Sequence, residues 1–198
     1  SELRSQRDAA AAQQQRVQED AARARAARIA AARQLGLLLA SEHLTFDEIE
    51  RVLDAIYAPL NNGVYRAGFA TTQIAYEEAF RDVFATLDEL EQRLAGQGPF
   101  LFGDRFTETD IRLFVTLVRF DAAYHGLFKC NLRLIADYPA LNAYLHRVHA
   151  IPGVAETVSI DHIKQGYYSI RALNPNGIVP VGPDLPGLAP VDLQRAAA

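Results

Sequence analysis

The chain has 198 residues, of which 49% are hydrophobic, and this length allows one domain or one domain with an additional segment. A formal charge of −4 excludes a broadly basic surface for nucleic acid, and no apolar run approaches the roughly 18 residues of a transmembrane helix. The only cysteine, Cys130, excludes an internal disulfide framework and favours a reducing compartment, either the cytoplasm or an organellar matrix.

The N-terminal stretch has an unusual composition. Residues 1–34 contain twelve alanines together with Gln, Arg and Glu, and neither Gly nor Pro, which favours a helix. Seven arginines oppose four acidic residues in this stretch, whereas residues 35–198 hold 13 basic and 20 acidic residues. We interpret residues 1–40 as a helical arm. It is a solvated helix or linker, a small-residue helix that packs closely on a partner, or the remnant of a targeting segment.

The remainder of the chain shows helical periodicity and no convincing strand pattern. In the stretch from Thr72 to Leu94, large apolar residues recur at alternating gaps of four and three, which is the spacing of an amphipathic helix. A later stretch is apolar almost all round and is expected to be a buried central helix. From Asn174 onward, five prolines in 25 residues predict a tail that lies extended on the surface or dangles. The expected helices are 41–60, 72–94, 109–125, 139–149 and 154–168.

The central helix is preceded by the sequence of a capping box. Thr107 and Asp110 stand three residues apart, immediately before the apolar run. We expect the Thr107 hydroxyl to accept from the Asp110 amide, and the Asp110 carboxylate to accept from the Thr107 amide. Buried ion pairs are a further expectation for Asp110 and Asp121. Their candidate partners are Arg66, Arg112 and Arg119.

A capped and buried central helix of this kind resembles the sixth helix of the glutathione transferases. Longer segments resemble the xi class of that family, the glutathionyl-hydroquinone reductases, over about residues 44–184, which corresponds to the helical C-terminal half. The resemblance implies an all-α, glutathione-transferase C-terminal-like bundle at 41–173, between the arm at 1–40 and an extended Pro-rich tail at 174–198. The segments that carry it are Asn61–Gln73, Arg119–Tyr124, Phe128–Asn131, Ile135–Pro139, Pro152–Thr157, Asp161–Lys164, Tyr167–Tyr168 and Asn174–Pro180.

The resemblance also implies a ligand site. In the xi class, three tyrosines of the helical domain line the hydroquinone pocket, and the matching positions are Tyr65, Tyr124 and Tyr167. A phenol offers an aromatic face to a quinone ring and a hydroxyl that can donate to its oxygen. The alternative is that each is a core tyrosine with one satisfied hydroxyl. His146 and His149 are three apart on a helix but lack a third ligand, so we expect no metal site.

The family's catalytic parts have no counterpart in this sequence. Xi-class enzymes carry a thioredoxin-like domain that holds glutathione and supplies a catalytic cysteine in a Cys-Pro-Trp-Ala-type motif. This chain has no tryptophan, and Cys130 does not match that nucleophile, so we interpret it as structural. We therefore expect no catalytic residue and no cofactor in this chain, although glutathione is the family's co-substrate.

Two hypotheses of function follow from the resemblance. The leading one is a catalytically incomplete homologue that acts as a binding or structural subunit of a larger assembly. It would have a protein partner, in a homo-oligomer or a larger complex, and a quinone- or hydroquinone-type ligand. The alternative is the helical half of an active glutathionyl-hydroquinone reductase whose thioredoxin-like domain is on another chain or was removed. The sequence favours a chain without enzymatic activity of its own but does not decide the question, and the family that it resembles comprises glutathione transferases and glutathione-dependent oxidoreductases.

Overall fold

The computed structural model describes Arg23 and residues 45–188, so the arm predicted at 1–40 lies, apart from Arg23, outside the described residues. The chain divides into two compact units, residues 1–48 and 49–198, and the fold described below is that of the second unit. The described residues contain helices and two isolated β-bridges within Phe100–Arg105, and no β-strand, which confirms the all-α class. The α-helices are α2 (Phe46–Ile56), α3 (Gly63–Gly68), α4 (Gln73–Gln97), α5 (Glu108–Arg119), α6 (Pro139–His149) and α7 (Ile160–Tyr168).

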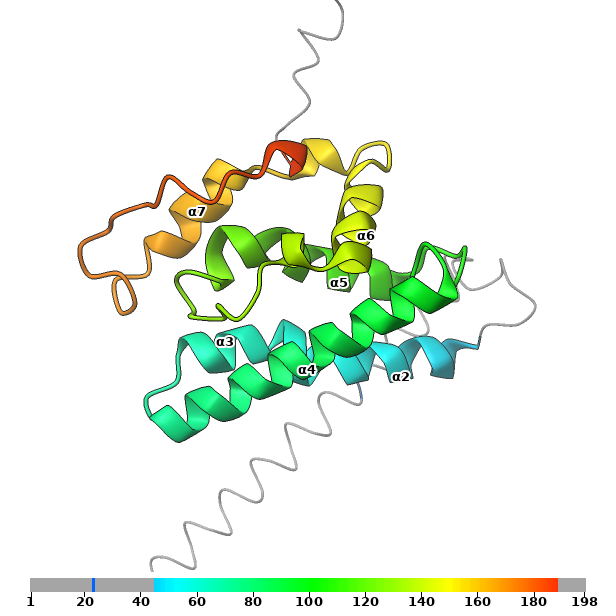
Figure 1. The fold of residues 1–198 in the computed structure, drawn as a ribbon, viewed down its shortest axis with the longest axis horizontal. Helices are drawn as coiled ribbons and strands as arrows, with labels where there is room; N and C mark the ends of the chain where they lie inside the picture. The colour runs from blue at the N-terminus through cyan, green and yellow to red at the C-terminus, as the bar shows by residue number, and fades with distance from the viewer. Residues whose placement is uncertain (1–22, 24–44, 189–198) are drawn as a thin grey trace, which may run out of the picture. The chain divides into compact units, whose positions relative to one another are not determined.

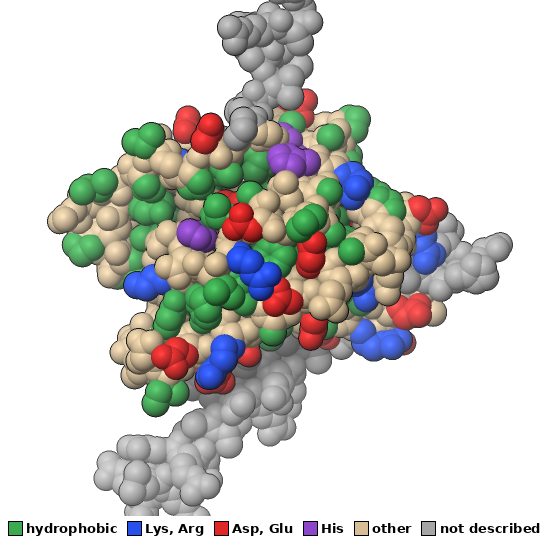
Figure 2. Space-filling view, in the orientation of Figure 1, with side chains coloured by type: hydrophobic (Ala, Val, Ile, Leu, Met, Phe, Trp, Pro, Cys, Tyr) green, Lys and Arg blue, Asp and Glu red, His purple; other side chains and the backbone are tan. Residues whose placement is uncertain are grey.

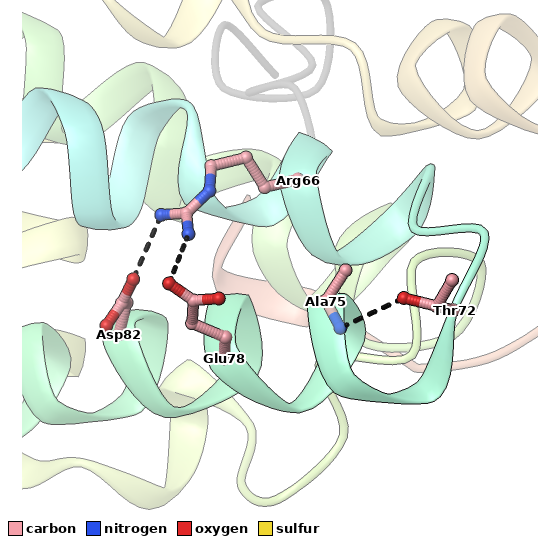
Figure 3. Close-up of polar contacts among 5 residues, drawn as sticks. All are labelled: Arg66, Thr72, Ala75, Glu78 and Asp82. Carbon is pink, nitrogen blue, oxygen red and sulfur yellow. Dashed lines mark hydrogen bonds and ion pairs between the residues drawn. The ribbon is translucent and has the colours of Figure 1, made fainter.

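Helices α3 and α4 form an antiparallel hairpin, in which the long α4 runs back along α3 (Figure 1). Arg66 of α3 contacts two acidic side chains of α4, and a further contact caps the beginning of α4 (Figure 3). The Arg66 guanidinium donates to Asp82 at 2.9 Å and lies 3.8 Å from Glu78. Thr72 is the N-cap of α4, and its hydroxyl accepts from the Ala75 amide at 3.3 Å. The cap explains why α4 begins where the sequence predicts, within one residue.

Two of the expected helices end in wider turns. Residues Tyr57–Asn61 and Phe120–Tyr124 are π-helical, so the predicted helices 41–60 and 109–125 are not continuous α-helices. Pro59 lies within the first of these turns and has no amide hydrogen, which removes one hydrogen bond of the α-helical pattern. Such π-helical turns are frequent at functional sites. The second turn carries Tyr124.

The expected helix at 154–168 is also divided. A 3₁₀ turn covers Ala155–Thr157, and α7 begins only at Ile160. Ser159 has an extended backbone, and its hydroxyl accepts from the His162 amide at 3.3 Å, so it is the N-cap of α7. A serine at this position satisfies an amide that has no partner within the helix, and it therefore sets the beginning of α7.

Helix α5 and its π-helical continuation lie in the middle of this unit (Figure 1). They contact the first π-helical turn on one side and α6 and α7 on the other. Leu113, Leu117 and Phe120 are fully buried, as the sequence predicts. Ile111 and Val115 are 50% and 40% exposed, however, so the expectation that α5 is buried all round is wrong for this stripe.

Asp110 links three segments at the beginning of α5. It is fully buried and forms the capping box with Thr107, whose amide and hydroxyl both donate to the carboxylate, at 2.8 and 2.9 Å. The Asp110 amide donates to the Thr107 carbonyl at 3.1 Å. The other carboxylate oxygen accepts from the Leu101 amide at 3.0 Å and from the Tyr144 hydroxyl at 3.2 Å. Asp110 thus holds the preceding loop and α6 against α5.

The buried ion pairs expected from the sequence are wrong. Arg66 pairs across the hairpin, and Arg112 pairs with Glu108 at 2.9 Å on the half-exposed face of α5. The buried carboxylate of Asp121 accepts instead from the backbone amides of Ile135 and Ala136, at 2.7 and 3.2 Å. Backbone amides satisfy a buried carboxylate without the desolvation of a guanidinium, so no arginine is needed.

The C-terminal segment packs on the helices as far as Leu188. The Lys164 ammonium, on α7, donates to the Val181 carbonyl at 2.7 Å. Residues Pro186–Leu188 form a 3₁₀ turn that contacts α6, and Leu188 is only 4% exposed. The segment therefore follows the surface of α7 and α6, and residues beyond Leu188 lie outside the described part of the chain.

Acidic and basic side chains intermix on the face seen in Figure 2, and the described residues there form no continuous basic patch. No helix in the described part of the chain is long and apolar enough to cross a membrane. The same residues contain no group of three or more His, Cys, Asp or Glu side chains close enough to hold a metal ion.

Protonation of His149 is expected to destabilise the protein at mildly acidic pH. His149 is 6% exposed, its Nε2 has no hydrogen-bond partner among the described residues, and burial, followed by the neighbouring His146, lowers its pKa from 6.5. The unfolded chain therefore binds a proton more readily than the folded protein. We expect stability to fall as the pH decreases from 6.5 through the lower pKa of the folded state.

Urea unfolding of the wild type and of His149→Gln at about pH 7.5 and 5.5 measures this effect. The variant, which is neutral at both pH values, should lose less stability on acidification. His162→Gln removes a solvent-exposed histidine and should keep the wild-type response. Equal acid sensitivity of the wild type and His149→Gln would contradict the prediction.

Candidate functional site

Three tyrosine hydroxyls, from three distant parts of the chain, meet at one point. The hydroxyl of Tyr167 lies 2.6 Å from that of Tyr65 and 2.9 Å from that of Tyr124. The third pair, Tyr65 and Tyr124, is separated by 3.4 Å. The structure therefore brings together the three tyrosines that the sequence proposes for a ligand site. Each phenol has one hydrogen to donate, so three mutual contacts use all three hydrogens within the cluster.

Different elements place the three rings. Tyr65 lies on α3, Tyr124 in the π-helical turn after α5, and Tyr167 on α7. A fourth ring, the fully buried Phe128, supports them: it stacks on Tyr124 with ring centroids 5.2 Å apart and meets Tyr65 edge-on at 5.3 Å. Gly68 lets α3 approach Phe128, because a Cβ there would lie 2.9 Å from that of Phe128. The close approach of Gly68 to Phe128 thus sets the position of α3, and with it Tyr65, relative to the other rings.

Tyr124 and Tyr167 are protonated at neutral pH. Burial, reinforced by the hydrogen bonds to Tyr167 and Tyr65, raises the pKa of Tyr124 far above 10.0. Burial also raises the pKa of Tyr167, and the nearby positive charge of Arg119 partly opposes this shift. Protonated phenols are hydrogen-bond donors, so the cluster can donate to a ligand oxygen that replaces its longest internal contact.

The cluster borders two neighbouring pockets of about 570 and 480 Å³. Tyr65 is 38% exposed and opens toward both pockets, whereas Tyr124 is 2% exposed and lines only the smaller one. The larger pocket has apolar walls that include Phe114, Val118 and Ile163. Volumes of this size suit a small aromatic molecule. The residues that line both pockets are Tyr65, Val115, Arg119 and Tyr167.

Basic side chains beyond the three tyrosines also line these pockets. Arg119 lines both pockets, Arg112 lines the smaller one, and the exposed His162 lines the larger one. Among the described residues that line either pocket there is no Asp or Glu. Sequence reasoning missed Arg119 as a site residue because it assigned the side chain to a buried ion pair. The available signal was its position, five residues before Tyr124 in the matching segment Arg119–Tyr124.

The buried thiol of Cys130 is unsuited to act as a nucleophile. It is fully buried, and its thiol lies 3.9 Å from the Phe128 carbonyl oxygen. Burial raises the pKa of the Cys130 thiol to about 12, although the neighbouring Lys129 opposes the shift. A thiol with this pKa is almost entirely protonated at neutral pH and is a poor nucleophile. The described residues therefore hold an aromatic pocket without an activated thiolate.

Comparisons with known proteins show which family this helical unit resembles. Residues 73–147 match the family model of the glutathione S-transferase C-terminal domain. Glutathionyl-hydroquinone reductase PcpF of Sphingobium chlorophenolicum is 59% identical over 144 residues, which cover 71% of this chain and 46% of that protein. Its counterpart YqjG of Escherichia coli is 49% identical over 137 residues, which cover 69% and 42%. The solved xi-class transferase of Natrialba magadii is 46% identical, with a TM-score of 0.69 over 73% of this chain and 44% of that structure.

The helices and the matched family model thus define a glutathione S-transferase C-terminal domain. Within that class, the chain is a homologue of the xi-class glutathione transferases, the glutathionyl-hydroquinone reductases, over their helical C-terminal half. The chain spans about half the length of the curated relatives that it matches.

Proposed function

We propose that this chain supplies the hydroquinone-binding half of a glutathionyl-hydroquinone reductase. The observation that carries the proposal is the convergence of the Tyr65, Tyr124 and Tyr167 hydroxyls beside a pocket with apolar walls. A hydroquinone ring fits between such walls, and its oxygen can accept from a phenol of the cluster. The name of the relatives, glutathionyl-hydroquinone reductase, supports the same ligand class.

In this proposal, the thiol chemistry takes place on a domain other than this helical unit. Reduction by this class of enzyme needs a thiolate that attacks the sulfur joining glutathione to the ring. The carbon–sulfur bond breaks, and the ring takes up a proton and leaves as hydroquinone. A second glutathione then resolves the mixed disulfide, which gives glutathione disulfide and the free thiolate. The sequence has one cysteine, and its burial excludes that role. The proposal therefore places the nucleophile and the glutathione site on a thioredoxin-like domain that works together with this unit. This corresponds to the alternative hypothesis of the sequence analysis.

Binding of hydroquinone to the 198-residue chain, measured by calorimetry, tests the ligand site. We expect saturable binding to the wild type and about tenfold weaker binding to Tyr167→Phe, because that variant removes the hydroxyl shared by both short contacts. Tyr76→Phe is the matched control. Its hydroxyl donates to the Lys129 carbonyl at 2.7 Å and lines neither pocket, so the affinity should not change. Absence of saturable binding, or equal affinities of all three proteins, would refute the site.

An activity measurement separates the two hypotheses of function. The chain alone should show only background reduction of a glutathionyl-hydroquinone, and Cys130→Ser should show the same rate, because the buried thiol takes no part. Addition of the part of PcpF that lies outside the matched 46% should produce glutathione-dependent turnover that requires Tyr167. Hydroquinone binding without turnover in this mixture would instead favour a subunit that acts by binding alone.

A further inference from the structure

The junction of the two pockets holds a cation that has no partner carboxylate in the described part of the chain. Arg119 is half-buried at the end of α5, and one of its terminal nitrogens donates to the carbonyl of Val115 in the same helix. No carboxylate of the described residues lies within ion-pair distance of it. The neighbouring Arg112 differs, because its guanidinium is already engaged by Glu108 at 2.9 and 3.0 Å. Arg119 therefore retains N–H donors for a ligand.

The surroundings of Arg119 favour an anion attached to an aromatic ring. The described lining of both pockets contains no acidic side chain, and the nearby Glu108 is paired with Arg112, so no lining carboxylate repels a bound anion. Val115, Tyr65 and Tyr167 line the same junction and offer apolar and aromatic contacts next to the guanidinium. A guanidinium recognises a carboxylate through paired, charge-assisted hydrogen bonds, and these are stronger where water is partly excluded.

We propose that Arg119 is a specificity-determining residue of this pocket and that it selects aromatic diols carrying a carboxylate. The inference deepens the proposed function and rests on it, because it names the substrate class that the tyrosine pocket prefers. The tyrosine hydroxyls hold the ring oxygens, and Arg119 holds the carboxylate beside them. A purely architectural role is the competing explanation, since a cation in the last turn of a helix also stabilises the helix dipole.

Titration of the full 198-residue chain with hydroquinone and with 2,5-dihydroxybenzoate, which differ by one carboxylate, tests the proposal. We expect the wild type to bind the acid about tenfold more tightly than the neutral diol. High salt should weaken binding of the acid and leave hydroquinone binding unchanged. Arg119→Gln should abolish the preference, whereas Arg119→Lys should keep part of it, because lysine retains the charge but not the planar fork.

The matched control is Arg81→Gln, which makes the same charge change at an exposed position of α4 outside both pockets. This variant should keep the full preference for the acid. Equal wild-type affinities for the two probes, or a preference that Arg119→Gln leaves intact, would overturn the inference. The inference would also fail if Arg119→Gln only lowered the melting temperature and weakened binding of both probes equally.

Two further outcomes locate a failure. If neither probe binds, the tyrosine pocket is not a ligand site, and the proposed function fails together with the inference. If both probes bind in a Tyr167-dependent manner but without a preference, the proposed function stands and only the role of Arg119 is refuted.

S-methylglutathione, which has carboxylates but no ring, is the third probe. Arg119-dependent binding of this tripeptide alone would assign the charge to the glutathionyl group and overturn the ring-carboxylate proposal.

Discussion

Asp110→Ala is expected to destabilise the protein by about 3–5 kcal/mol, which is a large effect for one substitution. The carboxylate is fully buried and accepts from the Thr107 amide and hydroxyl, the Leu101 amide and the Tyr144 hydroxyl. Alanine leaves the Thr107 and Leu101 donors without this acceptor, whereas the Tyr144 hydroxyl keeps the Asp110 backbone carbonyl at 3.0 Å. Each unsatisfied buried donor costs about 1–3 kcal/mol. The carboxylate link between the Leu101 amide and the Tyr144 hydroxyl of α6 is lost at the same time. Urea unfolding monitored by circular dichroism measures the difference.

Two other alanine substitutions calibrate this value. Asp137→Ala removes a carboxylate at the same capping-box position of the 3₁₀ turn Ile135–Asp137, but this one is exposed and accepts only from the Leu134 amide among the residues described, at 2.9 Å. We expect a cost of about 1 kcal/mol or less, because water can replace the carboxylate. Thr107→Ala should cost about 1 kcal/mol, since its amide still donates to Asp110. Similar losses for Asp110→Ala and Asp137→Ala would show that the buried network is not decisive.

Gly68→Ala is expected to destabilise the protein by about 2–3 kcal/mol and to weaken hydroquinone binding by about tenfold or more. A Cβ at this position would overlap the ring of Phe128 and lie 2.9 Å from its Cβ. Phe128 is fully buried, and the clash involves the atoms nearest its backbone, so rotation of the ring cannot relieve it. Displacement of Phe128 also moves Tyr124, which stacks on it, and thereby disturbs the hydroxyl cluster.

Gly96→Ala is the matched control for this substitution. It lies near the end of α4, where a new Cβ would meet no atom within 4 Å, so the helix should gain about 0.5–1 kcal/mol. The Gly68→Ala/Phe128→Leu double variant tests the mechanism, because a smaller side chain at 128 leaves room for the new methyl group. Its loss of stability should be smaller than the sum of the two single losses. Additive losses, or unchanged ligand binding by Gly68→Ala, would contradict the proposed contact.

Local sequence patterns were sufficient for α4, α5 and α6 and for the residues at which these three helices begin. The alternating three- and four-residue spacing predicts α4, and Thr72 and Thr107 mark the beginnings of α4 and α5. These features depend on residues that are four or fewer positions apart, so the chain itself specifies them. The two π-helical turns were not predicted, because a helical pattern does not distinguish hydrogen bonds to the fourth residue from those to the fifth.

The candidate site was accessible only in part from the sequence. Matching segments identified Tyr65, Tyr124 and Tyr167 as candidates, but no local pattern indicates that their hydroxyls meet. Arg119 was assigned to a buried ion pair, whereas the folded chain places it at the junction of the two pockets. The sequence does not show which carboxylates lie near Arg119. Only the folded structure shows that no acidic side chain of the described residues pairs with it, which makes it a candidate for ligand binding.

The sequence by itself determined that this unit is a bundle of capped, amphipathic helices and that one half of a transferase-like architecture is present. The tertiary structure alone decided which side chains act together. The three tyrosine contacts join residues 43, 59 and 102 positions apart, and Asp110 accepts from Tyr144 across 34 positions. Hydrogen bonds of this kind form only after helices α3, α5, α6 and α7 have packed, because each partner is positioned by the core of a different segment.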